Sequence, residues 1–435
     1  MKITVIGTGY VGLVSGACFS EFGHTVTCVD KDADKIQRLL NGEIPIYEPG
    51  LDGLVARNSA EKRLLFTTDL KAAMDGAEAV FIAVGTPSRR GDGHADLQYV
   101  FAAVEELAAF IKSYTVIITK STVPVGTGAE IKNRLQGLLD EKLYDVASNP
   151  EFLREGAAIE DFMRPDRVVV GVDSDAAKKV MNALYRPLFL NETPILFTNL
   201  ETAEITKYAA NAFLATKISF INEMADLCEK VGADVQQVSK GIGLDKRIGN
   251  KFLHAGPGFG GSCFPKDTRA LVHSADTYGV PMRIVRSVVD VNEKRKIAMA
   301  ERVITACNGS VEGKRIAVLG LTFKPNTDDM RESPSLDIIP ALQKHGAVVH
   351  AHDPKGMSEA KEMLEDVTFY DDPYGPLKDA DALVIITEWN QFRALDLKRV
   401  HSLMNKPVLV DFRNIYSKAD MAAEGFDYIG IGRGK

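Results

Sequence analysis

A glycine-rich segment, GFGGSCFPKD from Gly258 to Asp267, combines residue types that could carry out a reaction. Cys263 can serve as a nucleophile, because a thiolate attacks a carbonyl carbon. Lys266 would favour the thiolate, and Asp267 could orient water or move a proton. The glycines nearby would let the backbone approach a ligand. The segment therefore indicates a catalytic thiol, whereas a buried and inert role is expected for the other cysteines, Cys18, Cys28, Cys228 and Cys307.

A second group of residues predicts a dinucleotide site. The glycines of GTGYVG, Gly7, Gly9 and Gly12, follow the apolar run ITVI and open a stretch of helical length. Gly7 would permit a tight turn, Gly9 would let the backbone approach a pyrophosphate, and Gly12 would allow the helix to pack on the strand. Asp30 ends the next run, TVTCVD, where a carboxylate would bind ribose hydroxyls and repel a 2′-phosphate. NAD is therefore expected rather than NADP, although Lys35 could partly offset that repulsion.

Lys207 and Asn211 stand four residues apart in a segment with helical periodicity. This spacing places both side chains on one face of a helix, where two hydrogen-bond donors could converge on one oxygen atom. Donors aimed at a developing negative charge typically stabilise a transition state by about 3 kcal/mol. The alternative interpretation is a solvated lysine and a polar residue on an amphipathic helix.

The elements that must position these residues follow two patterns. Up to about residue 199, short runs such as KITVIG and TVIITKSTVP alternate with stretches of helical length, which is typical of parallel strands joined by helical crossovers. From Glu201 to about Val231, and from about Met282 to Ala306, the periodicity is helical, and strand patterns return with RIAVLG. The sequence thus predicts an α/β fold with two doubly wound, Rossmann-like domains, at 1–199 and 311–435. A central helical region with a long helix, at 200–310, would join them.

Composition and charge exclude several classes of protein. The 52 basic and 59 acidic residues give a net charge of −7, so no broad basic surface for nucleic acid is expected. The five cysteines form no C-x-x-C pair and cannot close a complete disulfide framework, which indicates a reducing, cytoplasmic compartment. Glycines interrupt the apolar N-terminus, which is expected to form a strand, turn and helix and not a signal peptide. No sequence pattern predicts a membrane span or a metal site.

Four motifs resemble those of one enzyme family. GFGGSCFPKD, NPEFLREG from Asn149, KYAANAFLATKISFINE from Lys207 and FKPNTDDMRESPS from Phe323 are similar, in order and over the whole chain, to the UDP-glucose/GDP-mannose dehydrogenase family. The resemblance implies an NAD-dependent, four-electron oxidation of UDP-glucose to UDP-glucuronate. Cys263 would capture the intermediate aldehyde as a thiohemiacetal, which is oxidised to a thioester and then hydrolysed. The covalent bond would hold the carbon in position for the second hydride transfer.

The resemblance also implies roles for individual residues. Lys207 and Asn211 would stabilise the negative oxygen, Thr122 and Asp267 would hold a catalytic water, and Glu151 would assist thioester hydrolysis. It assigns the NAD site to Gly7, Gly9, Tyr10, Val11, Gly12, Asp30, Lys35, Gly85, Thr86, Pro87, Ser121, Thr122, Glu155, Lys266 and Arg331. It assigns the nucleotide-sugar site to Glu151, Phe152, Leu153, Arg154, Glu155, Lys207, Asn211, Arg247, Phe252, Leu253, His254, Ala255, Gly256, Gly260, Phe323 and Lys324.

The assembly and the C-terminal unit are further expectations. A homodimer or larger homo-oligomer is expected, and the long helical region could supply a two-fold contact. The family resemblance implies that Arg247 is contributed across a dimer interface. RIAVLG ends in one glycine and lacks the full fingerprint, which favours a nucleotide-sugar domain over a second NAD domain. The segments starting at Phe66 and Phe369 read alike, through either duplication or the common rhythm of doubly wound folds.

Two other functions are compatible with the pattern. A GDP-mannose dehydrogenase would use the same chemistry and a similar cysteine loop, although HAGPGFGGSCFPKD favours the glucose enzyme. A non-catalytic NAD-binding or regulatory protein could have the same fold. That alternative leaves the Cys263 segment and the pair formed by Lys207 and Asn211 unexplained.

Overall fold

The computed structural model describes residues 1–87 and 95–434. The chain forms two compact units, of which the first comprises residues 1–210 and 273–280. The second comprises residues 211–272 and the chain from residue 281 onward. The three-domain boundaries expected from the sequence stay a prediction.

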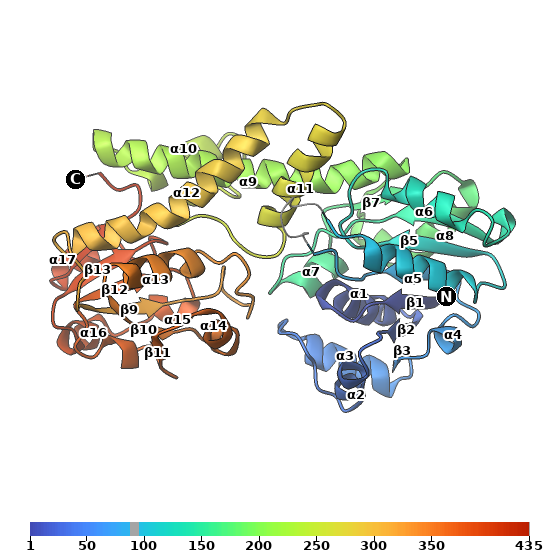
Figure 1. Cartoon of the computed structure of the whole chain (residues 1–435), viewed down its shortest axis with the longest axis horizontal. Coiled ribbons are helices and arrows are strands. Elements are labelled where there is room, and N and C mark those ends of the chain that lie inside the picture. Colours follow the sequence, from blue (N-terminus) through green and yellow to red (C-terminus); the bar gives the residue numbers. More distant parts are fainter. Residues whose placement is uncertain (88–94, 435) are drawn as a thin grey trace. The chain divides into compact units, whose positions relative to one another are not determined.

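The first unit is built on a sheet that has eight strands in the described part of the chain, in the order β3-β2-β1-β4-β5-β6-β7-β8 (Figure 1). Neighbouring strands run parallel, except that β7 pairs antiparallel with β6 through Ser148 and Gly171. The expectation of parallel strands is wrong at this pair, because an apolar run predicts burial and not strand direction. The strands are β1 (Lys2–Ile6), β2 (Thr25–Val29), β3 (Leu64–Thr67), β4 (Ala79–Ile82), β5 (Thr115–Thr119), β6 (Tyr144–Ser148), β7 (Val168–Gly171) and β8 (Ile195–Thr198).

Helices cover both faces of this sheet, which explains why several of its strands are apolar throughout. Val5 and Phe81 belong to one buried cluster together with Phe19 of a helix, whereas Ile6 and Ile82 belong to a second cluster. The helices are α1 (Tyr10–Glu21), α2 (Ala33–Leu40), α3 (Leu51–Ala60), α4 (Leu70–Ala73), α5 (Gln98–Ala108), α6 (Thr127–Leu135), α7 (Ala158–Met163) and α8 (Asp175–Leu184), with 3-10 turns η1 (Glu141–Leu143) and η2 (Arg186–Asn191).

The second unit contains a parallel sheet with the order β11-β10-β9-β12-β13-β14 in the described residues (Figure 1). This order repeats that of the first six strands of the first unit. Ile316 and Val318 belong to one buried cluster and Ala317 and Leu319 to another, so both faces are again covered. The elements are β9 (Arg315–Leu319), α13 (Ser335–Lys344), β10 (Val348–His352), α14 (Met357–Met363), β11 (Val367–Phe369), η3 (Gly375–Leu377), β12 (Ala382–Ile385), α15 (Asn390–Arg393), α16 (Leu397–Leu403), β13 (Val408–Asp411), α17 (Lys418–Ala423) and β14 (Asp427–Gly430).

Long helices lie between the two sheets in sequence, as predicted. They are α9 (Leu200–Val231), α10 (Val235–Gly243), α11 (Phe264–Thr277) and α12 (Arg283–Ala306). Helix α9 has 32 residues, and its bounds agree with the stretch expected from Glu201 to about Val231. Helix α11, which begins directly after Cys263, was not expected from the sequence. The predicted fold class, two Rossmann-like α/β domains with a long central helix, is confirmed.

The five cysteines are free thiols in different environments. Cys18, Cys28, Cys228 and Cys307 are buried as expected, and Cys263 is partly exposed. Burial raises the pKa of Cys28 to about 12, which keeps that thiol protonated and unreactive. Within the described part of the chain, no helix has the length and apolar character that a membrane crossing needs.

Candidate functional site

The glycine turn after β1 has the geometry of a dinucleotide-binding turn. Gly7 has a φ of +101°, and a Cβ there would lie 2.6 Å from the carbonyl oxygen of Ala83. A Cβ at Gly12 would lie 1.9 Å from the carbonyl oxygen of Gly7, so α1 can pack on the turn only with glycine at this position. Gly9 is different, because no atom lies within 4 Å of a Cβ built there. The open space at Gly9, beside the N-terminus of α1, fits the approach of a pyrophosphate.

The carboxylate of Asp30 follows β2 at the same edge of the sheet. Its Oδ2 accepts hydrogen bonds from the N–H and the hydroxyl of Thr8, at 2.8 and 2.7 Å, and Lys35 Nζ lies 3.3 Å away. Burial disfavours the charged form, but the hydrogen bonds from Thr8 and the Lys35 ammonium together lower the pKa of Asp30. Asp30 is therefore ionised at neutral pH, and Lys35 compensates part of its charge.

Two more loops at this edge contain predicted cofactor residues. Residues 85–87 follow β4, and Ser121 and Thr122 follow β5. Ser121 Oγ donates to the carbonyl oxygen of Val84 at 2.6 Å, and Thr86 Oγ1 donates to that of Thr122 at 3.1 Å. Because β4 pairs with both β1 and β5, these loops lie next to the glycine turn. The first unit thus brings together the candidates from the three loops.

Lys207 and Glu151 form a buried ion pair in the first unit. Lys207 Nζ lies 2.9 Å from Glu151 Oε1, and the two side chains are only 4% and 5% exposed. The ammonium also lies 5.3 Å from the centre of the Phe152 ring. The alternative interpretation of Lys207 as a solvated lysine is therefore wrong.

Glu151 is ionised in spite of its burial. Burial raises its pKa, but Lys207, the N–H of Leu153 at 2.6 Å and the nearby Lys120 outweigh this effect and lower the pKa below the ordinary value of a glutamate. An ionised, buried carboxylate can accept a proton from water, so Glu151 has the charge state of a general base. Its loop, residues 149–157, also carries Arg154, whose guanidinium is paired with Asp161.

A second polar group lies one helical turn after Cys263 in the second unit. Asn211, on α9, donates through Nδ2 to Asp267 Oδ2 at 2.6 Å, and both side chains are buried. The carbonyl oxygen of Cys263 accepts a helical hydrogen bond from the N–H of Asp267 at 2.8 Å. Cys263 therefore occupies the N-terminus of α11, where the partial positive charge of the helix stabilises a negatively charged sulfur. Lys266, in the first turn of the same helix, lies 3.8 Å from Asp267.

The glycines before Cys263 pack against the protein itself. A Cβ at Gly260 would lie 2.2 Å from the carbonyl oxygen of Glu332, and one at Gly261 would lie 2.7 Å from the Phe323 ring. The 323–332 segment fills the space that a side chain would need at both positions, so packing within the unit requires glycine there, and a backbone approach to a ligand stays a prediction. Two of the four family-like motifs, the cysteine loop and FKPNTDDMRESPS, are thus in direct contact.

Several predicted nucleotide-sugar residues line a cavity of about 490 Å³ in the second unit. Leu253, His254 and Ala255 contribute to its wall, together with the basic side chains of Lys240 and Arg413. Basic groups together with polar side chains suit a phosphorylated ligand.

Other predicted residues lie near the cysteine loop or at the surface. Phe252 has a φ of +62°, and its ring lies 6.0 Å from that of Phe264. Lys324 Nζ lies 5.2 Å from the centre of the Phe323 ring. Arg331 and Arg247 are exposed, and their guanidinium groups pair with Asp329 and Asp245. Neither guanidinium is therefore buried within its own unit.

Three family models match the chain. They describe the UDP-glucose/GDP-mannose dehydrogenase family: its NAD binding domain at residues 1–189, its central domain at 201–294 and its UDP binding domain at 317–418. A UDP-glucose 6-dehydrogenase of Rhizobium meliloti (strain 1021) is 61% identical over 435 residues, which is 100% of both chains. One of Bacillus subtilis (strain 168) is 50% identical over 99% of this chain and 93% of the relative. A solved UDP-glucose dehydrogenase from the archaeon Pyrobaculum islandicum has a TM-score of 0.90 and 39% identity, covering 100% of this chain and 98% of that one.

The chain belongs to the UDP-glucose/GDP-mannose dehydrogenase family. It is accordingly an NAD-dependent oxidoreductase, and the family's NAD binding domain covers the glycine turn and Asp30. The structure fits this cofactor, because Gly9 leaves open space at a helix N-terminus and Asp30 presents an ionised carboxylate beyond β2. Bound NAD supplies a hydride acceptor.

Two positioning groups in this family member were not found from the sequence. Lys120, in the KSTVP segment, is buried and donates to Asn149 Oδ1 at 3.0 Å and to the Tyr185 hydroxyl at 3.3 Å. Burial lowers the pKa of Lys120 to about 8, although the charge of Glu151 acts in the opposite direction. Lys120 thus fixes the start of the loop that carries Glu151.

The other group lies on α12 and holds the cysteine loop. Asn292 accepts from the N–H of Phe259 at 2.8 Å through Oδ1 and donates to its carbonyl oxygen at 3.0 Å through Nδ2. Arg295 Nε donates to the carbonyl oxygen of Gly256 at 2.7 Å. The only sequence signal for this role was the presence of polar residues on a helix with an apolar stripe.

Proposed function

We propose that the chain oxidises UDP-glucose to UDP-glucuronate with two equivalents of NAD. The full-length likeness to relatives named UDP-glucose 6-dehydrogenase supports this substrate. The observation that carries the chemistry is the position of Cys263, a partly exposed thiol at the N-terminus of α11, beside the buried pair formed by Asn211 and Asp267. A cytoplasmic location stays a prediction from the cysteine pattern.

In the first half-reaction, the sugar C6 alcohol would give up a hydride, which bound NAD would accept, and a proton to a water held by Thr122 and Asp267. The product is an aldehyde. Lys207 and Asn211 donate hydrogen bonds to the oxygen on which negative charge develops. Each donor is buried next to a carboxylate, Glu151 or Asp267, which fixes its orientation before the substrate binds.

In the second half-reaction, the sulfur of Cys263 would bond to the aldehyde carbon while the C=O double bond opens and the thiol proton passes to the oxygen, giving a thiohemiacetal. This carbon would then give up a hydride, which a second bound NAD would accept, and the oxygen would release its proton to water, leaving a thioester. Glu151 accepts a proton from the water that attacks the thioester carbon. The C–S bond then breaks, the sulfur takes up that proton to regenerate the Cys263 thiol, and the acid is released.

We assign the nucleotide sugar to the residues that the family pattern indicates. They are Glu151–Glu155, Lys207, Asn211, Phe252–Gly256, Gly260, Phe323, Lys324 and, from a second copy of the chain, Arg247. The cofactor residues Tyr10, Val11, Glu155, Lys266 and Arg331 complete the assignment for NAD. Phe323 is held in place by Arg413, whose guanidinium donates to its carbonyl oxygen at 3.2 Å.

Incubation of the protein with NAD and limiting UDP-glucose tests the reaction through NADH absorbance. We expect two NADH per UDP-glucose and little turnover of GDP-mannose. Cys263→Ser should bind UDP-glucose in calorimetry but release no acid, whereas the matched control Cys228→Ser should form acid. Undiminished acid formation by Cys263→Ser would refute the covalent step.

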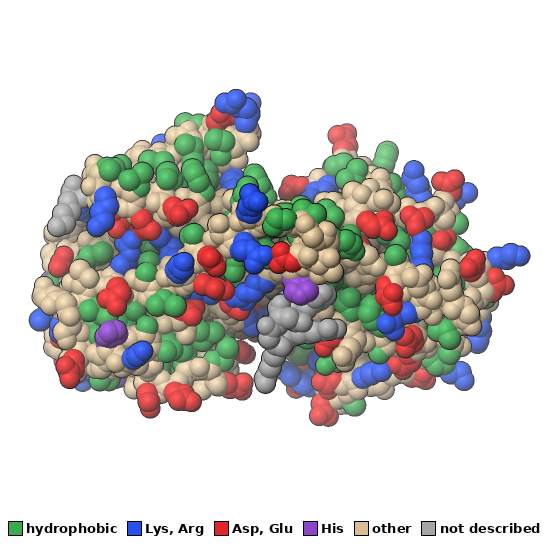
Figure 2. Space-filling view, turned by 45° about the horizontal axis from the view of Figure 1, so that its top comes forward, with side chains coloured by type: hydrophobic (Ala, Val, Ile, Leu, Met, Phe, Trp, Pro, Cys, Tyr) green, Lys and Arg blue, Asp and Glu red, His purple; other side chains and the backbone are tan. Residues whose placement is uncertain are grey.

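The expected dimer is supported by an apolar surface of the second unit. Phe213, Phe220 and Leu227 recur every seven residues on α9 and are 67%, 50% and 53% exposed. Figure 2 shows hydrophobic side chains gathered over the region of the long helices. A seven-residue apolar repeat suits pairing with another helix, and we assign this face to a second copy of the chain. Light scattering should give a dimer or larger assembly for the wild type and a smaller species for Phe213→Glu/Phe220→Glu.

A further inference from the structure

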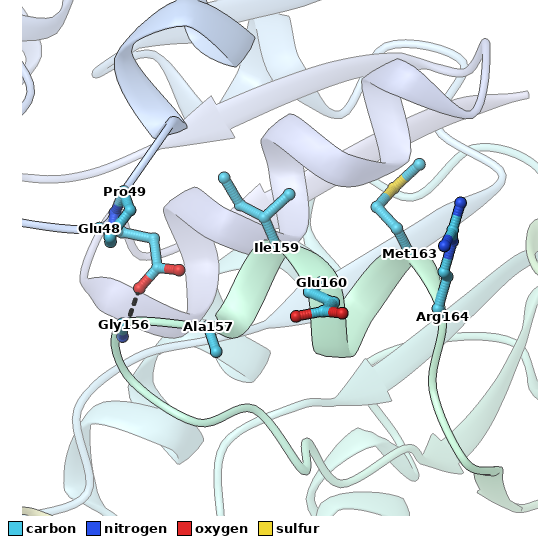
Figure 3. Close-up of a pocket in the computed structure, with 8 residues that line it drawn as sticks. All are labelled: Glu48, Pro49, Gly156, Ala157, Ile159, Glu160, Met163 and Arg164. Carbon is cyan, nitrogen blue, oxygen red and sulfur yellow. Dashed lines mark hydrogen bonds between the residues drawn. The ribbon is translucent and has the colours of Figure 1, made fainter. Parts of the chain in front are cut away.

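The segment EIPIYEPG, before α3, contains a buried carboxylate that takes no part in the proposed reaction. Glu48 is 6% exposed. Its Oε2 accepts the N–H of Gly156 at 2.6 Å and the hydroxyl of Tyr10, and its Oε1 accepts the N–H of Ala158 at 2.8 Å. Figure 3 shows the carboxylate turned toward the backbone at Gly156. Three donors thus converge on one side chain.

Two of these donors belong to the end of the loop that carries Glu151 and Glu155. Gly156 has a φ of +79°, and its N–H also lies 3.2 Å from the Tyr10 hydroxyl. Ala158 is the first residue of α7, so its N–H has no partner within that helix. Glu48 satisfies both N–H groups and ties the loop to the segment before α3. The two ends of these bonds are more than 100 residues apart in sequence.

The third donor belongs to the dinucleotide turn. Tyr10 is the first residue of α1, directly after Gly9. Burial and the neighbouring Glu48 raise the pKa of the Tyr10 hydroxyl, so this group stays protonated and can donate. Glu48 therefore connects the turn proposed to bind the pyrophosphate with the loop proposed to bind the nucleotide sugar.

We propose that Glu48 is a positioning residue that holds the 149–157 loop in the conformation that binds the nucleotide sugar. This inference rests on the proposed function of that loop. The role requires two acceptor oxygens, because each oxygen accepts from a fixed backbone N–H group. A glutamine has a single acceptor oxygen and would turn an NH₂ group toward one of the two backbone donors. Glu48→Gln thus keeps the size of the side chain and removes its function.

The test compares Glu48→Gln and Glu48→Ala with a matched control, Glu160→Gln. Glu160 lines the same surface pocket as Glu48 in Figure 3 and is exposed. The N–H groups of Gly156 and Ala158 bond to Glu48. The control removes one negative charge from the pocket and keeps the bonds from the N–H groups of Gly156 and Ala158 to Glu48. For Glu48→Gln we expect the KM and the calorimetric Kd for UDP-glucose to rise by roughly 10-fold and kcat/KM to fall by up to about 100-fold.

A purely structural role would give a different result. It would lower the melting temperature and the active fraction, while the KM and Kd for UDP-glucose stayed at the wild-type values. An unchanged KM and Kd in Glu48→Gln would overturn the inference. Glu160→Gln should match the wild type in all three constants, and a loss equal to that of Glu48→Gln would also overturn it, because charge alone would then explain the effect.

Hydrogen exchange separates this inference from the proposed function. The amides of Gly156 and Ala158 should exchange at least 10-fold faster in Glu48→Gln than in the wild type and the control. If the wild type does not oxidise UDP-glucose, the proposed function fails while this exchange result still reports the tether. If the wild type is active and the exchange rates of these amides do not differ, the tether itself is refuted.

Discussion

Replacement of Lys207 by methionine should destabilise the first unit and abolish turnover for two separable reasons. Methionine matches the length of the lysine stem and removes only the ammonium. Glu151, 5% exposed, then loses the partner 2.9 Å from its Oε1. An uncompensated buried charge costs about 3–5 kcal/mol. Because the N–H of Leu153 at 2.6 Å and the charge of Lys120 remain, the lower end of that range applies, about 3 kcal/mol.

The double variant Lys207→Met/Glu151→Gln isolates the electrostatic part of this cost. A neutral glutamine can be buried without an ammonium, so most of the lost stability should return, with a coupling energy of about 2 kcal/mol. Activity should not return. Loss of the donor alone should lower kcat by about 10²–10³-fold.

The pH dependence gives a second signature. In the wild type, the pKa of Glu151 is lower in the folded than in the unfolded chain, so its contribution to stability is present at neutral pH and is lost as the pH falls through the folded pKa. In Lys207→Met, burial should raise the folded pKa above the unfolded one. The single variant should therefore regain stability relative to the wild type as the pH falls from 7 to 5.

Hydrogen exchange of the β5 and β6 amides measures these changes, since a chain with two units need not unfold in one step. NADH formation measures turnover in the same preparations. Equal destabilisation of the single and double variants, or a deficit in Lys207→Met that does not change between pH 7 and pH 5, would refute the assignment of an energetically coupled ion pair.

Three further perturbations have distinct outcomes. Gly12→Ala should unfold or strongly destabilise the first unit, because its Cβ would lie 1.9 Å from a carbonyl oxygen, whereas Gly9→Ala should leave the melting temperature unchanged and raise the KM for NAD. Since the pKa of Lys120 is lowered to about 8, the stability of the wild type relative to Lys120→Met should rise with pH, by at most about 1.4 kcal/mol per pH unit between pH 8 and pH 10. Unfolding free energies of the two proteins that change in parallel with pH, measured by chemical unfolding, would contradict this. Asn292→Ala should remove two hydrogen bonds to Phe259 and change the rate at which iodoacetamide alkylates Cys263 by more than 3-fold in either direction. An unaltered rate would show that the loop does not depend on Asn292.

The sequence predicts those parts of the site that depend on local spacing. Gly7 and Gly12 follow from close packing around the turn after β1, Gly9 follows from the open space beside the N-terminus of α1, and the four-residue spacing of Lys207 and Asn211 follows from helical geometry. Both relations involve residues within one or two adjacent elements. The same is true of the parallel direction of the strands, which crossover connections impose everywhere except at the pair formed by β6 and β7.

Contacts between distant segments could not be predicted. Glu48 meets Gly156 across 108 residues, and Asn292 meets Phe259 across 33. Each is a polar residue in a segment whose own pattern indicates only a loop or a helix. The helix that begins after Cys263 was not predicted, although Pro265 stands in its first turn, where proline is favoured.

The two units share a strand order and differ at the position that binds a ribose in such folds. In the first unit, Asp30 follows β2 with a partly exposed carboxylate. The equivalent residue of the second unit is Asp353, directly after β10, and it is 2% exposed. The carboxylate of Asp353 accepts from the N–H groups of Leu321, Thr322, Lys355 and Gly356, from the Thr322 hydroxyl and from the Trp389 indole.

These internal donors leave no acceptor capacity for ribose hydroxyls at Asp353. The turn after β9 is also filled by atoms of the unit itself. Gly320, with a φ of +89°, has a positive φ like Gly7, and a Cβ there would lie 2.5 Å from the Thr387 side chain. The next positions are Leu321 and Thr322, so no glycine stands where Gly9 opens the first unit to a pyrophosphate. A repeated fold thus keeps its dinucleotide turn open in one unit and fills it with its own side chains in the other, which explains why an NAD binding domain and a UDP binding domain can share one topology.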